Sequence, residues 1–596
     1  MSAEATRSPT TFTRPEDRVP PGYQYAPHPN ASSPTDMRVA TDHPGLLSRP
    51  DQSPLYRREP TYDQGYYAKS SFPRQLDINT FQSPEAVPRN ISLQPLNGLE
   101  GQLSANWARL LKGHGVPMIA HEIRIAVDGT GHYLSFINVD ALEKQLWHEQ
   151  YRARIHPGFI WACLAMARLM RSSSVEDGQA GLQMALNLFQ EAKRALDIAW
   201  ADPTYAYAAL IIALFESSAH PNYTHGRALS ALIELDDYIH QLRLTMIDAR
   251  DPDACRFQQG VPVVYYPEGR DHLAAGNKCP CFVPSPVDPY HTRSYIPPWD
   301  ASWSPEQVRD EEIRRLCWSA LSLISGFLAQ AATDNRSMPK FHLSDPGSYS
   351  QYQLLFPGEI IDRLQPAYAA RDGLTPKESV WALYCRSMLL WNYCNRFRYV
   401  SANDEDHVSE DISEAWAEAQ AIEESLDAHN CSLDTALIYT TREHIHNIRM
   451  IVTQALRRLQ GYDHGFKLTP GPIFKRKHAE DWIYYQDQLV RRAAATASNL
   501  QSPESIQLTQ RPWRVQWFIH QLSTCLQLWE NERTLEEALH LGRRLLQVID
   551  TMNYLWDCPT NEAQASELRA RLTEACRLMG VELPFPRNLS APAKFE

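Results

Sequence analysis

Apolar residues recur at intervals of three and four from about Leu93 almost to the end of the chain, which is the period of a helix that buries one face. Strands would alternate in steps of two, and the one strand-like run is the short segment 261–266. No fixed-length repeat relates the runs, so a regular solenoid is not expected. The pattern predicts an all-α fold over residues 93–582, a large bundle or array of about a dozen helices.

Each helical run carries its own apolar stripe and can therefore be placed separately. The runs cover residues 140–151, 159–170, 182–200, 203–215, 229–242, 308–332, 380–391, 412–426, 433–459, 482–497, 515–529, 535–555 and 563–579. Ser304 and Thr375 both stand before a proline and predict capped helix starts. Asp140 and Glu143 predict a capping box at another start, and Gly461 predicts a helix end.

Prolines mark the segments outside this pattern. Residues 1–92 hold fourteen of the 42 prolines among Ser, Thr, Asp and Tyr. Such a segment buries too little apolar area to offset its ordering entropy, so it predicts a disordered Pro/Ser-rich arm. Residues 248–303 hold nine more prolines and predict an excursion between helices. Residues 583–596 are expected to form a C-terminal tail.

The charge balance argues against a protein that grips nucleic acid by bulk charge. Lys+Arg 58 minus Asp+Glu 70 gives a formal charge of −12. The eleven cysteines are odd in number and irregularly spaced, which is typical of reduced thiols in an intracellular protein. The longest nearly uninterrupted apolar run, 205–215, is far shorter than the ~18 residues that span a bilayer. We therefore expect no secretion signal and no membrane span.

The chain lacks local motifs of nucleotide and zinc chemistry. No GxxxxGK[ST] loop occurs, and the second histidine that would complete a zinc-binding helix after His121 is missing. Asp236-Asp237 comes nearest to the magnesium motif of all-α isoprenoid enzymes, but His240 stands where a hard-cation ligand is needed. We interpret this run as a solvated helix face, and we predict no catalytic, cofactor-binding or metal-binding residue.

Cys279-Pro280-Cys281 is the one close cysteine pair, and Cys255 and His272 lie near it in the sequence. A structural zinc site needs four ligands and usually CxxC spacing. Partly buried loop thiols are therefore the favoured interpretation over a metal site.

Arg314 and Arg315 lie close to Trp318 in one helical run. They are candidates for clamping an acidic partner, although pairing with the acidic residues 310–312 one turn away is the default on a helix. Trp318, Trp381 and Trp391 are predicted to be core residues rather than the lining of a pocket.

The segment 304–359 resembles the middle homology region of fungal zinc-cluster transcription regulators. Members of that family carry an E..RR..W helix, a following apolar helix and a connection that ends in LFPGE or a similar step. The matching positions here are Glu311, Arg314, Arg315, Trp318, Phe356, Pro357, Gly358 and Glu359. Residues 192–220 resemble the segment that precedes this region, and the likeness extends over roughly 93–579.

The resemblance implies a nuclear regulator of transcription whose helical region is a regulatory domain. It also implies that this domain binds a small-molecule effector, and that the chain forms a homodimer or a heterodimer with DNA-binding relatives. Family members bind DNA through an N-terminal six-cysteine cluster that holds two zinc ions. This sequence has no cysteine before Cys163, so we expect no zinc cofactor and no direct DNA binding. The cluster was lost, or it lies upstream of this chain, or the protein works as the partner of a DNA-binding relative.

Two other functions stay open. One is a metal-dependent isoprenoid-type enzyme, which an all-α fold could house. The other is a non-catalytic helical scaffold that recruits partners through its surfaces and its arm. The sequence favours the regulator, which is not an enzyme.

Overall fold

The computed structural model describes residues 100–197, 202–257, 260–264, 297–334, 336–344, 352–364, 375–399, 405–427, 436–463, 476–500 and 505–584, with the single residues 429 and 502. All of them belong to one compact unit of the chain, Asp77–Glu596. The predicted arm 1–92, most of the excursion with Cys279 and Cys281, and most of the predicted tail lie outside the described residues.

The all-α prediction is confirmed over the described residues. The α-helices of the N-terminal half are α1 (Glu100–Gly113), α2 (Val116–Thr130), α3 (Val139–Trp147), α4 (Glu149–Arg152), α5 (Pro157–Met170), α6 (Gly178–Leu196), α7 (Pro203–Glu216) and α8 (His225–Gln241). Those that follow are α9 (Pro305–Thr333), α10 (Glu359–Leu364), α12 (Val380–Asn395), α13 (Glu405–Asp427), α14 (Ala436–Asp463), α15 (Arg476–Ala497), α16 (Ile506–Thr509), α17 (Arg514–Asn531), α18 (Glu536–Leu555) and α19 (Pro559–Met579). Short 3₁₀ turns are η2 (Gly131–Leu134), η3 (Leu244–Met246), η5 (Pro376–Glu378) and η6 (Arg396–Tyr399).

Strand structure among the described residues is one short antiparallel pair. β1 (Cys255–Arg256) pairs with β2 (Gln353–Leu354), with Cys255 opposite Leu354. The strand-like run 261–266 was predicted wrongly over its described part, because 261–264 are not in a strand. Val261 and Val264 are instead buried against the helical core, so their apolar character reflects packing and not a sheet.

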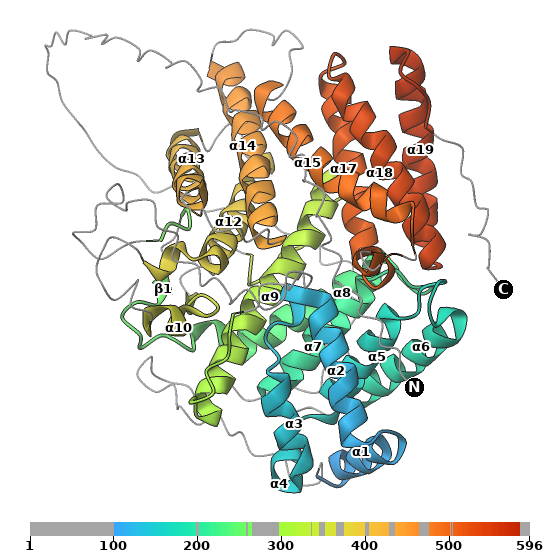
Figure 1. Cartoon of the computed structure of the whole chain (residues 1–596). Helices are drawn as coiled ribbons and strands as arrows, with labels where there is room; N and C mark the ends of the chain where they lie inside the picture. Colours follow the sequence, from blue (N-terminus) through green and yellow to red (C-terminus); the bar gives the residue numbers. More distant parts are fainter. Residues whose placement is uncertain are drawn as a thin grey trace, which may run out of the picture. The chain divides into compact units, whose positions relative to one another are not determined.

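Helix α9 is the central element of the described unit. In Figure 1 it crosses between α1–α8 on one side and α12–α19 on the other. It contacts α7, α8, α12, α17, η2 and η3. From Ile313 to Thr333 every residue but Gly326 is buried, so this helix is apolar all round where a surface helix would show one stripe.

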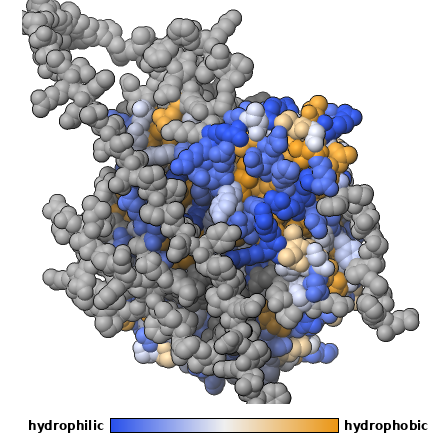
Figure 2. Space-filling model, turned by 45° about the horizontal axis from the view of Figure 1, so that its top comes forward, coloured by the Kyte–Doolittle hydropathy of each residue, from blue (hydrophilic) through white to orange (hydrophobic). Residues whose placement is uncertain are grey.

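Among the described helices, α9 alone is long and apolar enough to match a membrane span, and 94% of its apolar window is buried inside the protein. That burial is typical of a core helix. Figure 2 shows one end of the molecule, where hydrophilic side chains predominate among the coloured residues and hydrophobic ones form separate patches.

The predicted helix boundaries are confirmed at some ends and wrong at others. Ser304 caps α9 with a full capping box, in which its Oγ accepts from Gln307 N at 3.3 Å and Gln307 Oε1 accepts from Ser304 N at 2.9 Å. Thr375 caps only η5, and α12 begins after a second cap at Ser379. Gly461 does not end a helix, because α14 continues to Asp463.

The capping box predicted at Asp140 and Glu143 is also wrong. α3 starts two residues earlier, where Asn138 Oδ1 accepts from Ala141 N at 3.1 Å. Asp140 and Glu143 instead pair with Arg124 on the surface, at 3.0 and 3.5 Å. These two carboxylates thus bind the guanidinium of Arg124 on α2, and not the backbone N–H groups at the start of α3 as the sequence pattern suggested.

Replacing the cap of the central helix tests this boundary. Ser304→Ala removes one acceptor from the first turn of α9 and should lower the free energy of unfolding by about 1 kcal/mol, the usual effect of losing such a cap. Ser566→Ala is the matched control, because this exposed serine in α19 donates to the carbonyl of Glu562 within its own helix. Urea unfolding should show no loss for the control, and equal losses in both variants would contradict the capping role.

Candidate functional site

Helix α9 brings four of the family-motif residues onto one buried face. Glu311, Arg314, Arg315 and Trp318 are spaced at i, i+3, i+4 and i+7, which places them on the same side of a helix. All four are buried. Three of them are charged, and a buried charge needs partners to offset its lost hydration. The partners come from segments distant in the sequence.

The carboxylate of Glu311 is the centre of this ionic network. It accepts from Arg314 Nη1 at 3.1 Å, from Arg315 Nε at 2.8 Å and from the backbone N–H of Gly358 at 2.8 Å. The default pairing of both arginines within their own helix is thus confirmed for Glu311. A role of these arginines as a clamp for an external acidic partner has no support, because both are buried and paired.

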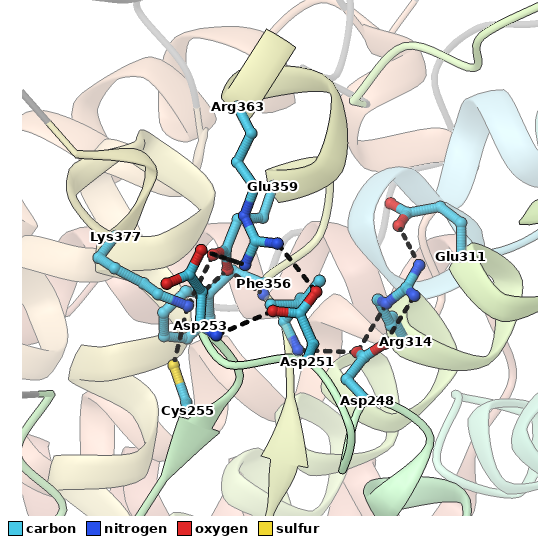
Figure 3. Close-up of polar contacts among 11 residues, drawn as sticks. Asp248, Asp251, Asp253, Cys255, Glu311, Arg314, Phe356, Glu359, Arg363 and Lys377 are labelled. Atoms are coloured by element: carbon cyan, nitrogen blue, oxygen red, sulfur yellow. Dashed lines mark hydrogen bonds and ion pairs between the residues drawn. The ribbon is translucent and has the colours of Figure 1, made fainter. Parts of the chain in front are cut away.

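Arg314 reaches a second carboxylate, in the loop after η3. Its Nε and Nη2 each donate to Asp248 at 2.7 Å, which is a bidentate pair (Figure 3). Asp248 also accepts from Leu355 N at 2.9 Å, and its own N–H donates to Gln353 O at 3.1 Å. One aspartate therefore joins the start of the proline-rich excursion to α9 and to the segment after β2.

Arg315 turns in the other direction along the same helix face. Its guanidinium donates to Ser135 O at 3.3 Å and to Pro298 O at 3.1 Å. It also lies over the ring of Trp299, 3.8 Å from the centroid. Burial lowers its pKa, and the charge of Glu311 opposes that shift. Arg315 thus ties the end of the excursion to the turn after η2.

The two aromatic residues of the motif, Trp318 and Phe356, pack against each other. Trp318 and Phe356 have ring centroids 5.4 Å apart, and Trp318 Nε1 donates to Leu355 O at 3.1 Å. Pro357 is buried in the turn that follows. Gly358 has φ +78, and a Cβ there would lie 2.8 Å from Pro297 Cβ. Only glycine fits this turn, for conformational and steric reasons.

Glu359 closes the network at the start of α10. Its carboxylate accepts from Phe356 N at 2.8 Å, from Lys377 Nζ at 2.7 Å and from Arg363 Nη2 at 2.8 Å. Figure 3 shows Lys377 and Arg363 converging on it from different segments. Lys377 also lies 5.1 Å from the centroid of the Phe356 ring. Glu359, the last residue of the LFPGE step, is therefore buried, and both of its carboxylate oxygens accept hydrogen bonds.

The network extends to β1 through Lys377 and Arg363. Lys377 Nζ lies 3.4 Å from Cys255 Sγ, and Arg363 Nη1 donates to Asp251 at 2.9 Å. Burial raises the pKa of the Cys255 thiol to about 11, although Lys377 acts to lower it. The sulfur is a protonated thiol at neutral pH, as expected for a reduced cysteine, and it is not activated as a nucleophile.

The arrangement suits a structural junction better than a reaction centre. Asp248, Glu311 and Glu359 each accept at least three hydrogen bonds from backbone or cationic donors. A divalent cation would have to displace an arginine or a lysine from these oxygens. The eight motif residues therefore form one connected unit that locks 355–359 and the excursion onto α9.

The aspartate pair on α8 is placed differently from its prediction. Asp236 is buried, and its carboxylate accepts from His342 N at 2.5 Å and from Leu343 N at 2.9 Å, so the solvated-face interpretation is wrong for it. Asp236, Asp237 and the His342 ring place ligand atoms within 4.8 Å of one another. Burial raises the pKa of Asp236 to about 6. Each of its oxygens accepts one backbone N–H, and the group of three among the described residues is one protein ligand short of a structural zinc site.

Other residues singled out in the sequence take structural places. Trp318, Trp381 and Trp391 are buried, as predicted for core residues. Glu122, which follows His121, is buried and pairs with Arg168 at 2.6 Å. The Cys279–Cys281 pair lies outside the described residues, and Cys255 contacts Lys377 as given above.

Sequence reasoning missed four charged members of the network, which are Asp248, Asp251, Arg363 and Lys377. The two aspartates stood at the edge of a stretch defined only by its prolines. A charged residue that meets its partner 66 positions away, as Asp248 meets Arg314, leaves no periodic signal. Arginines in a helix that is otherwise apolar and buried are the one hint that such a partner must exist.

Comparison with known proteins returned no family model, no curated protein and no solved structure that matches this chain. The likeness to the fungal zinc-cluster regulators accordingly rests on the motif residues themselves.

Removing the central carboxylate tests the junction. Glu311→Ala leaves two guanidiniums buried beside each other and should lower the free energy of unfolding by about 3–5 kcal/mol. Glu574→Ala is the matched control, because Glu574 also bonds an arginine on its own helix but is 51% exposed. The control should lose less than about 1 kcal/mol. Urea unfolding measures both, and a loss in Glu311→Ala no larger than in the control would contradict the proposed junction.

A second prediction concerns pH. Burial raises the pKa of Glu312, which accepts from Asn138 N and Tyr207 Oη, from 4.5 to about 7, against the opposing charges of Arg309 and Arg315. Between these values the unfolded chain has lost a proton that the folded chain retains, so this group lowers stability as pH rises. Glu312→Gln lacks that effect. Its stability relative to the unaltered protein should therefore rise from about pH 4.5 to pH 7 and then level off. Urea unfolding at several pH values measures it, and a constant difference would contradict it.

Proposed function

We propose that this chain is a transcription regulator of the fungal zinc-cluster type that acts in the nucleus through its helical domain and catalyses no reaction. The observation that supports it most is the convergence of the eight motif residues. Glu311 and Gly358 are 47 positions apart and bond directly. Residues that matched the family only as separate pieces of helix and loop pattern are parts of one buried unit, which strengthens the resemblance.

DNA affinity in this proposal comes from a partner. The chain carries a formal charge of −12 and has no cysteine before Cys163. Bulk charge therefore opposes binding to a phosphate backbone. We propose that the helical domain forms a heterodimer with a DNA-binding relative. A magnesium-dependent isoprenoid enzyme is less well supported, because His240 stands where the motif that begins at Asp236 and Asp237 needs a hard-cation ligand.

A tethering experiment tests the proposal. The full chain is fused to a heterologous DNA-binding domain, and transcription of a reporter with the matching site is measured. A change of several-fold relative to the DNA-binding domain alone is expected, in either direction. Fusions with Glu311→Ala should lose it, because the motif unit is disrupted, and fusions with Glu574→Ala should retain it.

Protein levels are matched by immunoblot. A fusion that leaves the reporter at the level of the DNA-binding domain alone would contradict a regulatory role. Magnesium-dependent turnover of a prenyl diphosphate by the purified chain would contradict the absence of catalysis.

A further inference from the structure

A group of metal-ligating side chains lies where α8 meets the segment that follows α9. Asp236 and Asp237 are in the second half of α8, and His342 belongs to the non-helical segment 336–344. One carboxylate oxygen of each aspartate and one ring nitrogen of His342 lie within 4.8 Å of one another. α8 packs against α9 (Figure 1), so the group joins a helix of the core to the chain that leaves the central helix.

Asp236 fixes the position of the segment that carries His342. Its two carboxylate oxygens accept from the backbone N–H groups of His342 and Leu343, at 2.5 and 2.9 Å. Leu343 is buried, and its carbonyl accepts from Tyr352 Oη at 3.0 Å. The fold itself therefore brings the ligand atoms together. Because a carboxylate oxygen has two lone pairs, each oxygen of Asp236 keeps one for a further partner.

Asp237 and the imidazole of His342 face each other beyond hydrogen-bonding distance. Asp237 Oδ1 and His342 Nε2 are 3.7 Å apart, and neither side chain makes a hydrogen bond among the described residues. Zinc bonds nitrogen and oxygen ligands at about 2.0–2.2 Å, so two ligands of one ion lie up to about 4.2 Å apart. The separation therefore suits two ligands of one ion better than a direct contact.

A second imidazole lies against the first. His240, one turn after Asp236 on α8, stacks on the ring of His342 with centroids 3.8 Å apart and ring planes 5° apart. This stack limits the orientations of the His342 ring and keeps it beside Asp237. The side chains of Asp237 and His342 are 38% and 45% exposed, so an ion can reach them from solvent.

We propose that Asp236, Asp237 and His342 bind a divalent transition-metal ion of the Zn²⁺ class, with water as the remaining ligand. Zinc sites that stay open to exchange carry three protein ligands and a water. An imidazole ligand favours zinc, whereas Mg²⁺ takes oxygen ligands. The sequence predicted no metal-binding residue here, because His342 is 106 positions from Asp236.

A bound ion would link α8 to the segment around His342. None of the three ligands is a cysteine, so this site differs from the six-cysteine zinc cluster of the family that the chain resembles. The inference goes beyond the proposed function, and it holds whether or not the chain regulates transcription.

Metal titration of the full chain tests the proposal. The protein is freed of metal with a chelator, kept reduced with a phosphine and titrated with zinc chloride or magnesium chloride. Equilibrium dialysis counts the bound zinc, and the melting temperature is followed in parallel. We expect saturable zinc binding with a rise in melting temperature, because an ion that binds the folded state stabilises it. Magnesium should give no rise. The absence of saturable zinc binding, or an equal rise with magnesium, would overturn the proposal.

Substitutions locate the ion. His342→Ala and Asp237→Asn each remove one ligand and should weaken zinc binding at least tenfold. His121→Ala is the matched control, because His121 is an exposed histidine on α2 outside the group, and it should bind zinc as the unaltered protein does. Without zinc the three variants should melt with the unaltered protein, since surface substitutions have small effects on stability. A zinc affinity that neither ligand substitution lowers would overturn the proposal.

Cobalt distinguishes this site from the thiols of the chain. Co²⁺ held by carboxylate and imidazole absorbs weakly in the visible range, whereas cysteine ligands add an intense sulfur-to-metal band in the near ultraviolet. We expect the weak bands alone, and their loss in His342→Ala. An intense band that persists in that variant would place the ion on cysteines such as Cys279 and Cys281, and would overturn the proposal. These measurements report metal binding and not transcription, so failure here and failure of the tethering experiment are distinguishable.

Discussion

The described structure depends on one carboxylate that has no contact with solvent. Glu311 is 0% exposed and holds two arginines of its own helix together with the backbone of Gly358. Both arginines have another partner in a different segment, Asp248 for Arg314 and Pro298 for Arg315, and a Cβ at Gly358 would collide with Pro297. Without the glutamate the two guanidiniums would remain buried side by side. A single buried charge thus holds three stretches of non-helical chain on α9.

Such a network of buried charges does more to select one folded arrangement than to raise the net stability of the fold. Buried ion pairs repay their desolvation only when the geometry is good and the remaining hydrogen-bonding positions are filled. Here they are filled mainly by backbone N–H groups of residues 355–358, which belong to no helix or strand that would satisfy them. The charges therefore select one placement of that turn and of the excursion. An apolar contact would stabilise the same helix without fixing either of them.

The ionic network and the hydroxyl of Ser322 share one helix and one turn. α9 carries the motif residues from Glu311 to Trp318 and, one turn further on, Ser322, whose Oγ lies 2.6 Å from Tyr384 Oη. The chain from 131 to 135 joins both, since Arg315 donates to Ser135 O and Ser319 Oγ donates to His132 O at 2.9 Å.

Sequence alone determined the helices, because burying one face imposes a period that can be read residue by residue, as in 515–529 and 535–555. It also fixed the cap of α9, since Ser304, Pro305 and Gln307 act within four residues. The motif residues were recognised, but what they do was decided by tertiary structure: Asp248 and Lys377 meet Arg314 and Glu359 across long stretches of chain that carry no pattern. The start of α3 was also not predictable from the local pattern. Asp140 and Glu143 resemble a cap of α3, but they form ion pairs with Arg124 of α2. Local interactions repeat along a sequence and can be read there, whereas a charge pair between distant segments exists only once the chain has folded.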